Sequence, residues 1–204
     1  MSNYCPTCLR PKSRCLCSFV RNVQHRTPVF ILQHSKERLH PKGTAKLAQL
    51  CLSNCTLISG KAFDKTVREI TSKYRPLLLW PSDPSLQASE NMASDENDVS
   101  ERKPIALIAI DGTWKKANKI YLSHPQLQSL PKLNIEGREN QYRHRKSPSD
   151  QHLSTLEAIY HGLNKLEGHT ESDVQQEALF TELLDAQQTM IEHWFDGFEP
   201  PNQQ

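Results

Sequence analysis

The sequence predicts an α/β fold built on a mainly parallel sheet. Short apolar runs alternate along the chain with stretches whose apolar residues recur every three or four positions, which is the order of strands and helices in such folds. Residues 105–110 (IALIAI) are apolar on both faces, as expected of a central parallel strand that helices cover on both sides. The composition of these 204 residues excludes collagen, coiled coils and wholesale disorder, and no apolar run is long enough to cross a membrane.

The expected elements follow in chain order. Apolar and β-branched runs predict the strands, and helical spacing of apolar residues predicts the helices. Residues 154–157 (STLE) form a complete capping box, which predicts a helix start at Ser154. Residues 84–104 contain few apolar side chains and are expected to form an exposed, mobile loop. The predicted strands are 27–33, 55–59, 74–80 and 105–110, with 130–135 as a candidate fifth, and the predicted helices are 44–52, 115–124, 154–166 and 177–194.

Four of the six cysteines lie within thirteen residues, as Cys5-x-x-Cys8 and Cys15-x-Cys17. No apolar run near the start could act as a secretion signal, so a cytoplasmic protein is expected, in which structural disulfides are rare. Two close thiolate pairs joined by a short loop can complete a tetrahedral zinc site; a redox pair and chance clustering are the alternatives. The sequence therefore predicts a zinc module at residues 1–22, followed by one domain at 23–204.

The formal net charge of +2 does not by itself indicate a nucleic-acid partner. The charge is uneven, however, because residues 10–46 and 138–146 are basic, whereas acidic residues gather at 83–101 and beyond 167.

Two groups of cations are candidate RNA contacts. Arg143, Arg145 and Lys146 alternate with aromatic side chains, a mixture that could contact phosphates and stack on bases, although a solvated basic loop would look the same. Lys115 and Lys116 lie at the start of a predicted helix, where positive charge opposes the helix dipole. A role other than helix stability is therefore expected for these lysines.

Three polar clusters follow predicted strands, at residues 34–40, 81–83 and 111–114. Because ligands of open α/β sheets bind beyond the carboxyl ends of the strands, these clusters are expected to converge on one pocket. Asp111 could accept a proton there, and Trp114 offers a broad face for stacking on a base or on adenine. A purely structural interpretation is open as well, in which Asp111 or Thr113 caps the following helix and Trp114 packs in the core.

The sequence Asp111-x-Thr113-Trp114 is the signature of the DTW-domain proteins, and other segments resemble that family in the same order. The resemblance extends from Cys5 to about residue 184. Its further segments are Cys5-x-x-Cys8 with Cys15-x-Cys17, residues 32–41 (LQHSKERLHP), Pro81-Ser82 and residues 153–158 (LSTLEA).

The resemblance implies a tRNA-uridine aminocarboxypropyltransferase with a SPOUT-like core and a trefoil knot. Such enzymes move the 3-amino-3-carboxypropyl group of S-adenosylmethionine (SAM) to uridine N3 and leave methylthioadenosine. The bacterial-type members, which this chain resembles in size and cysteine pattern, modify a uridine of the variable loop. The alternatives that remain are a SPOUT-type RNA methyltransferase and a zinc-bearing RNA-binding protein without catalysis.

The resemblance also implies roles for individual residues. Asp111 is expected to be the base that takes the N3 proton, with Asp83 as the substitute. Contacts to SAM are expected from Thr44, Pro81, Ser82, Thr113, Trp114, Ser154 and Thr155, contacts to tRNA from Lys115, Lys116, Arg143, Arg145 and Lys146, and zinc ligation from Cys5, Cys8, Cys15 and Cys17.

Overall fold

The protein forms one five-stranded parallel sheet with the strand order β2-β1-β4-β3-β5. The computed structural model describes residues 3–40, 43–81, 103–135, 153–168 and 174–195. Nearly all of the loop predicted at 84–104 and the whole of the basic run 138–146 lie outside these residues. The strands are β1 (Val29–His34), β2 (Cys55–Gly60), β3 (Arg75–Leu79), β4 (Ile105–Asp111) and β5 (Lys132–Leu133).

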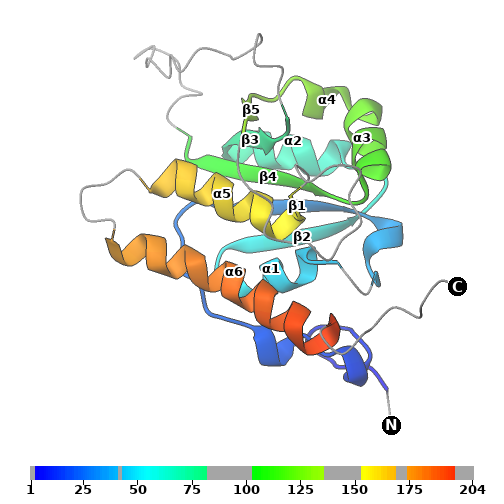
Figure 1. The fold of residues 1–204 in the computed structure, drawn as a ribbon. Helices are drawn as coiled ribbons and strands as arrows, with labels where there is room; N and C mark the ends of the chain where they lie inside the picture. Colours follow the sequence, from blue (N-terminus) through cyan, green and yellow to red (C-terminus); the bar gives the residue numbers. More distant parts are fainter. Residues whose placement is uncertain (1–2, 41–42, 82–102, 136–152, 169–173, 196–204) are drawn as a thin grey trace, which may run out of the picture.

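Helices cover both faces of the sheet (Figure 1). On one face lie α1, α5 and α6, and on the other lie α2, α3 and α4. No helix in the described part of the chain is both long enough and apolar enough to span a membrane. The helices are α1 (Ala45–Cys51), α2 (Asp64–Lys73), α3 (Trp114–Ser123), α4 (Pro125–Gln128), α5 (Thr155–Glu167) and α6 (Val174–Phe195), with 3-10 turns η1 (Lys12–Arg14), η2 (Cys17–Phe19) and η3 (Ser35–Glu37).

Strand β4 lies at the centre of the sheet, as its apolar sequence predicts. Successive side chains of a strand point to opposite faces. Leu107 and Ala109 accordingly pack with α1, α5 and α6, while Ile108 packs with the helices of the opposite face. Because both faces are buried, β4 has no polar residue before Asp111, where it reaches the edge of the core.

Helix α5 begins at the predicted capping box. The Ser154 hydroxyl accepts a hydrogen bond from the Glu157 N–H at 3.2 Å, and the Glu157 carboxylate accepts one from the Ser154 N–H at 2.7 Å. Further along, a Cβ on Gly162 would lie 2.9 Å from side-chain carbons of both Leu79 and Leu107, so the helix backbone lies directly on β3 and β4. The start of α5 is thereby held next to the centre of the sheet.

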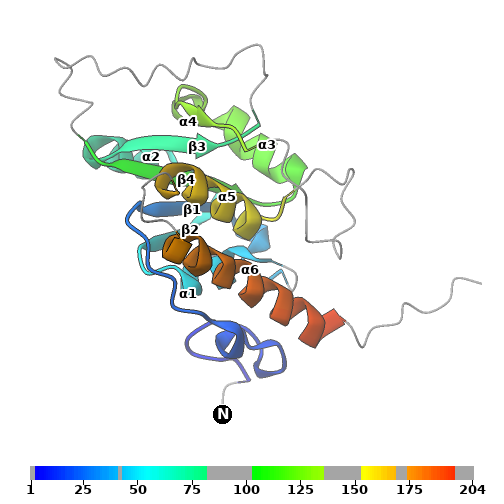
Figure 2. The ribbon, with the colours of Figure 1, turned by 60° about the vertical axis from the view of Figure 1, so that its left-hand side comes forward.

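The N-terminal residues pack beneath α6 (Figure 2). Phe19 is 4% exposed, and its ring meets that of Trp194 edge-on at 5.5 Å between centroids. Leu16 is fully buried in the same core that α1 and α5 line. The cysteine-containing segment therefore shares a core with the sheet and its helices.

Several elements differ from the sequence prediction. Helices α2 and α4 and the turn η3 were not predicted, and β5 contains two residues where six were expected. Helix α2 carried a usable signal, because Asp64 lies in its first turn, Lys73 lies in its last, and Val67 and Ile70 repeat at helical spacing. The short α4 begins at Pro125, a residue favoured in the first turn of a helix, and it is held in place by its buried Leu127.

Candidate functional site at the carboxyl edge of the sheet

The carboxyl ends of β1 and β4 lie side by side, because the two strands are parallel and their register pairs Gln33 with Asp111. The Gln33 side-chain N–H donates to Asp111 Oδ2 at 2.9 Å, and both residues are at most 4% exposed. A Cβ on Gly112 would lie 3.7 Å from the Cβ of His34. Two of the three clusters predicted to converge, residues 34–40 and 111–114, therefore lie side by side, whereas most of the third, 81–83, lies outside the described residues.

A chain of hydrogen-bonded polar side chains runs through the buried Asp111. The Ser59 hydroxyl donates to Gln33 Oε1 at 2.6 Å, and the Thr155 hydroxyl donates to Asp111 Oδ1 at 2.6 Å. We call these four residues, Ser59, Gln33, Asp111 and Thr155, the polar chain. The Ser59 hydroxyl orients the Gln33 amide so that its NH2 group faces the carboxylate. Each oxygen of Asp111 thus accepts a hydrogen bond, which offsets the cost of burying the charge.

Further hydroxyl groups gather at the start of α5. The Leu156 N–H donates to Thr44 Oγ1 at 3.4 Å, and the Ser154 hydroxyl donates to Gln187 Oε1 at 2.8 Å. Thr44, Ser154 and Thr155, which the sequence proposes as SAM contacts, thus lie around one helix start. Their hydroxyl groups bind protein partners there, and the bond to Gln187 also connects α6 to this edge.

Three aromatic rings stack beside the polar chain. The Trp80 and Trp114 rings lie 5.2 Å apart between centroids at an interplanar angle of 19°, and the Trp80 and Tyr121 rings lie 4.4 Å apart at 17°. We call these rings the aromatic stack. Trp114 is 46% exposed, so the interpretation that it packs in the core is wrong. Thr113 is the N-cap residue of α3, but its side chain makes no capping hydrogen bond. Both Thr113 and Pro81 are exposed.

The two lysines at the start of α3 differ in their surroundings. Lys116 Nζ lies 2.5 Å from Glu37 Oε1, and Glu37 is only 2% exposed, so this pair joins α3 to η3. Lys115 is exposed. Partial burial and the charge of Lys116 lower the pKa of His34, which keeps the imidazole neutral at pH 7. The remaining proposed contacts, Ser82, Asp83, Arg143, Arg145 and Lys146, lie outside the described residues.

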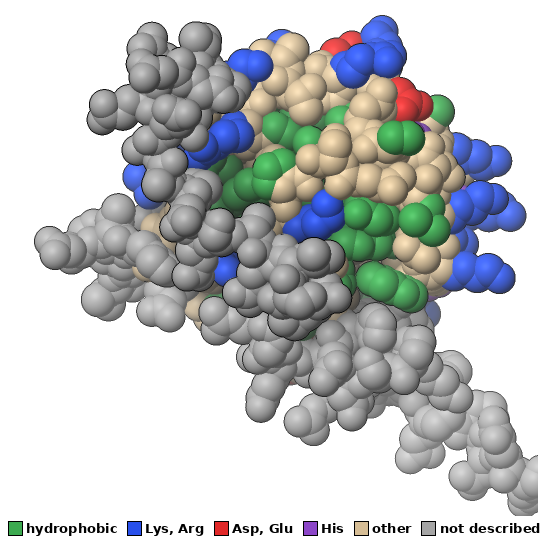
Figure 3. Space-filling view, turned by 90° about the horizontal axis from the view of Figure 1, so that it is seen from above, with side chains coloured by type: hydrophobic (Ala, Val, Ile, Leu, Met, Phe, Trp, Pro, Cys, Tyr) green, Lys and Arg blue, Asp and Glu red, His purple; other side chains and the backbone are tan. Residues whose placement is uncertain are grey.

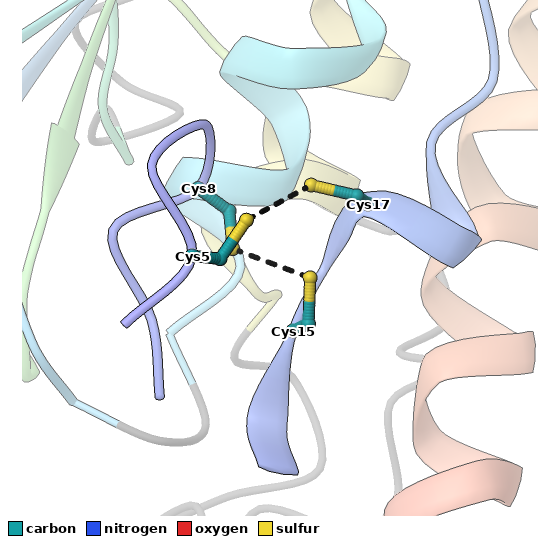
Figure 4. A group of neighbouring side chains, drawn as sticks. All are labelled: Cys5, Cys8, Cys15 and Cys17. Atoms are coloured by element: carbon teal, nitrogen blue, oxygen red, sulfur yellow. Dashed lines mark hydrogen bonds between the residues drawn. The ribbon is translucent and has the colours of Figure 1, made fainter. Parts of the chain in front are cut away.

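The four N-terminal cysteines point toward one another (Figure 4). Their sulfur atoms all lie within 4.8 Å of one another, with Cys5 and Cys17 at 3.6 Å and Cys8 and Cys15 at 3.8 Å. Four thiolates at about 2.3 Å from a tetrahedral zinc ion would stand about 3.8 Å apart. The thiol groups can therefore hold a metal ion with little rearrangement.

Backbone N–H groups surround these thiols. The N–H groups of Cys8 and Thr7 lower the pKa of the Cys5 thiol to about 6, whereas burial and the neighbouring Cys5 and Cys15 raise the pKa of the Cys17 thiol to about 12. Cys5 therefore ionises most readily, and binding a metal ion would require the other thiols to lose their protons as well. The Leu16 N–H points at Cys8 Sγ at 3.5 Å. Leu9 takes a left-handed conformation, with φ at 60°, to turn the chain back after Cys8.

Comparison with known proteins places this chain in a family. The DTW domain model matches residues 2–197. The chain belongs to the DTW domain family. It is 32% identical over 179 residues to tRNA-uridine aminocarboxypropyltransferase 2 of Drosophila melanogaster, a match that covers 83% of this chain and 68% of that protein. It is 30% identical over 172 residues to the Mus musculus protein of the same name, covering 80% of this chain and 56% of that one.

A second group of relatives matches a shorter part of the DTW domain. Over 88 residues the chain is 38% identical to tRNA-uridine aminocarboxypropyltransferase 1 of Xenopus tropicalis, a match that covers 39% of this chain and 30% of that protein. No solved structure matches the chain.

In this DTW domain, Arg10 connects the cysteine module to the carboxyl edge of the sheet. Its side chain is 3% exposed, and its guanidinium donates to the carbonyl oxygens of His40 at 2.5 Å and Gly43 at 3.3 Å. Burial lowers the pKa of Arg10, and the nearby Cys8 and Asp111 oppose that shift. Because the group stays charged, it acts as a fixed cationic clamp on the turn that leads into α1.

Sequence reasoning missed several residues that lie at this edge of the sheet. Gln33 is the one polar residue at the end of the predicted strand 27–33, and a polar side chain in an apolar run was the available signal. Trp80 likewise ends a predicted strand at the same edge. Ser59 also ends a predicted strand, 55–59, and offered the same signal. Arg10 carried none, because its partners lie 30 residues away or more.

Proposed function

We propose that this protein is a SAM-dependent tRNA-uridine aminocarboxypropyltransferase of the cytoplasm. It would transfer the 3-amino-3-carboxypropyl group of SAM to N3 of a tRNA uridine, in the variable loop, and release methylthioadenosine. Membership of the DTW family and the names of relatives at 30–32% identity support this proposal. The main supporting observation is the signature itself, which lies at the end of the central strand. It places the buried carboxylate of Asp111 three residues from the half-exposed ring of Trp114.

The reaction requires a carbon electrophile and a deprotonated nitrogen. SAM supplies the electrophile, because its sulfonium activates the Cγ of the aminocarboxypropyl group. The N3–Cγ bond forms as the Cγ–S bond breaks, and the electron pair of that bond returns to sulfur. The protein must present Cγ rather than the methyl group to N3, so orientation contributes much of the rate.

Asp111 is the proposed acceptor of the N3 proton. Gln33 and Thr155 each donate one hydrogen bond to it, which fixes the direction of the carboxylate. A base held rigidly in this way keeps its geometry during proton transfer. Asp83 remains the substitute for this role.

We further propose that the parallel sheet is SPOUT-like with a trefoil knot and that the cysteine module, residues 1–22, holds zinc. The five parallel strands with helices on both faces are compatible with such a core. The sulfur spacing matches tetrahedral zinc coordination. Contacts to SAM would come from the start of α5 and from Pro81, Ser82, Thr113 and Trp114.

The test is mass spectrometry of nucleosides from unmodified tRNA incubated with the protein and SAM. We expect one aminocarboxypropyl group on uridine and an equal amount of methylthioadenosine. A gained methyl group would identify a SPOUT-type methyltransferase instead. If no group is gained with zinc bound and several tRNAs supplied, the chain is a non-catalytic zinc-bearing RNA-binding protein.

A further inference from the structure

The carboxyl ends of β1 and β2 carry two exposed lysines. Strand β1 ends at His34, which is paired in register with Gly60, the last residue of β2. Lys61 therefore follows β2 directly beside His34, and Lys36 follows β1 two residues after it. Both lysines are exposed, and among the described residues neither forms an ion pair. The two strand ends thus present positive charge to the solvent.

His34 presents a neutral ring N–H at the same place. Its Nδ1 accepts a hydrogen bond from the Lys36 N–H at 3.2 Å, so the proton of the neutral ring lies on Nε2. Burial, and then the charges of Lys116, Lys61 and Lys36, lower the pKa of His34, while Glu37 opposes them, so the ring stays neutral at pH 7. His34 is only partly buried, and its Nε2 has no hydrogen-bond partner among the described residues. The Nε2–H is therefore a donor of fixed tautomer with ammonium groups nearby.

An anion with several oxygen atoms would complement this set of donors. The imidazole N–H offers one directed hydrogen bond, and the ammonium groups add attraction that depends little on direction. Phosphate groups of a nucleic-acid backbone are bound by such mixtures of cations and neutral donors. Figure 3 shows the face that carries α3 and α4, and Lys and Arg side chains project from its right-hand side, the side toward which β4 runs in Figure 1.

Two features of the sheet separate His34 from most of the proposed SAM contacts. Gln33 shares a face of the sheet with α5, where Thr155 lies, whereas His34 follows it in the strand and points to the opposite face, as the buried Leu32 does. The strand order places β1 and β2 on one side of β4, and β3, which leads to Pro81, on the other. An anion at the ends of β1 and β2 would therefore lie away from the start of α5 and from β3.

We propose that His34, Lys36 and Lys61 form a site for a backbone phosphate of the tRNA substrate. This inference rests on the proposed function and extends its contacts with the substrate to the ends of β1 and β2. The His34 Nε2–H would donate to a phosphate oxygen, and the two ammonium groups would offset the negative charge. The tRNA would then reach Asp111 across β1 and β2, while SAM would bind on the side of β3 and α5.

The salt dependence of tRNA binding tests the role of each side chain. Binding of a cation to a phosphate releases counterions, whereas a neutral donor releases none. Lys36→Ala and Lys61→Ala should each raise the Kd for unmodified tRNA about three- to tenfold and reduce the slope of log Kd against log salt concentration by about 0.7–0.9. His34→Asn should raise the Kd by about the same factor and leave the slope unchanged. The Kd for SAM should not change in any of the three variants.

Matched variants separate this role from effects on the fold. His34→Asn keeps an acceptor for the Lys36 N–H, because Asn is a preferred N-cap residue, but its side chain is too short to replace the Nε2–H. His34→Gln has a longer reach and an amide N–H, so it should recover part of the tRNA affinity. Lys73→Ala is the control for the lysines, because Lys73 is exposed at the end of α2, just before β3 begins at the opposite edge of the sheet. Thermal unfolding checks that each variant is folded.

Two outcomes would overturn the phosphate site. Weaker SAM binding by the three variants at unchanged tRNA affinity would assign these side chains to the SAM carboxylate, and unchanged affinity for both ligands would leave them as solvated surface. Either result leaves the proposed function intact as long as the unaltered protein transfers the aminocarboxypropyl group. Failure of the proposed function would instead appear as no transfer by the unaltered protein.

Discussion

The cysteine module and the polar chain hold their functional groups in opposite ways. The module gathers its four sulfur atoms from thirteen consecutive residues. A bound metal ion would provide most of the free energy that holds these sulfur atoms together. The polar chain gathers Ser59, Gln33, Asp111 and Thr155 from four separate elements, and hydrogen bonds hold it, of which the one between Gln33 and Asp111 is buried. The first arrangement depends on local spacing and the second on the whole sheet, and Arg10 connects them.

The largest effect should follow loss of a cysteine ligand. Cys8→Ser should abolish stoichiometric zinc binding and unfold the module, because structural zinc contributes about 10–16 kcal/mol to folding in small zinc domains. Metal content by mass spectrometry and thermal unfolding are the measurements. Cys55→Ser is the matched control, since Cys55 lies outside the cluster, where burial raises its pKa to about 12, and it should keep the zinc. Full zinc content in Cys8→Ser would exclude the four-cysteine site.

Next in size is the effect of breaking the polar chain. Asp111→Ala leaves the Gln33 amide and the Thr155 hydroxyl without their acceptor, and it should lower the free energy of unfolding by about 2–4 kcal/mol. Asp111→Asn should stay near the unaltered stability, because the Gln33 amide can flip and the Ser59 hydroxyl can then donate elsewhere. Urea unfolding measures both changes.

The same pair of variants tests the catalytic proposal. Asp111→Asn cannot accept a proton, so transfer should fall about 10²- to 10⁴-fold if Asp111 is the base. Full activity of a stably folded Asp111→Asn protein would contradict that role and leave the carboxylate as a positioning group. Thr155→Val is a useful companion, since it removes one donor to Asp111 and keeps the carboxylate.

These predictions also show what sequence alone can reveal. The cysteine site and the Ser154 capping box were predictable, because both depend on short spacings along the chain. The central position of β4 was predictable from its apolar faces. The hydrogen bond between Gln33 and Asp111 was not, because it depends on strand register across 78 residues, and the clamp by Arg10 joins segments 30 residues apart or more.

A smaller and more selective effect is expected at Arg10. Arg10→Gln removes the charge that clamps the His40 and Gly43 carbonyls, and we expect the KM for SAM to rise about tenfold while kcat and zinc content change little. Arg10→Lys should recover part of the loss. The exposed Lys12→Ala serves as control within the same module. Loss of zinc in Arg10→Gln would show that Arg10 stabilises the module rather than the turn.

The smallest effect concerns Glu167, far from both regions. Burial alone would raise its pKa, but hydrogen bonds from the Thr27 and Arg26 N–H groups and the nearby His25 lower it below the usual value. Its contribution to stability is therefore present above about pH 4.3, the ordinary glutamate value, and is lost as the pH falls through the lower folded value. Glu167→Gln should cost about 1 kcal/mol at pH 7, and the difference in melting temperature should shrink below pH 4. A difference that is constant with pH would contradict the assignment.

Helix α6 contacts both the start of α5, next to the polar chain, and the cysteine segment. Its Gln187 accepts the hydrogen bond of Ser154 at the start of α5, and its Trp194 covers Phe19 of the cysteine segment. A truncated protein that stops before α6 should therefore expose an apolar patch on the cysteine segment and loosen the start of α5 together. The cysteine segment also depends on α6 to bury Leu16 and Phe19. If the segment were transferred to another protein, that protein would have to supply an equivalent apolar surface.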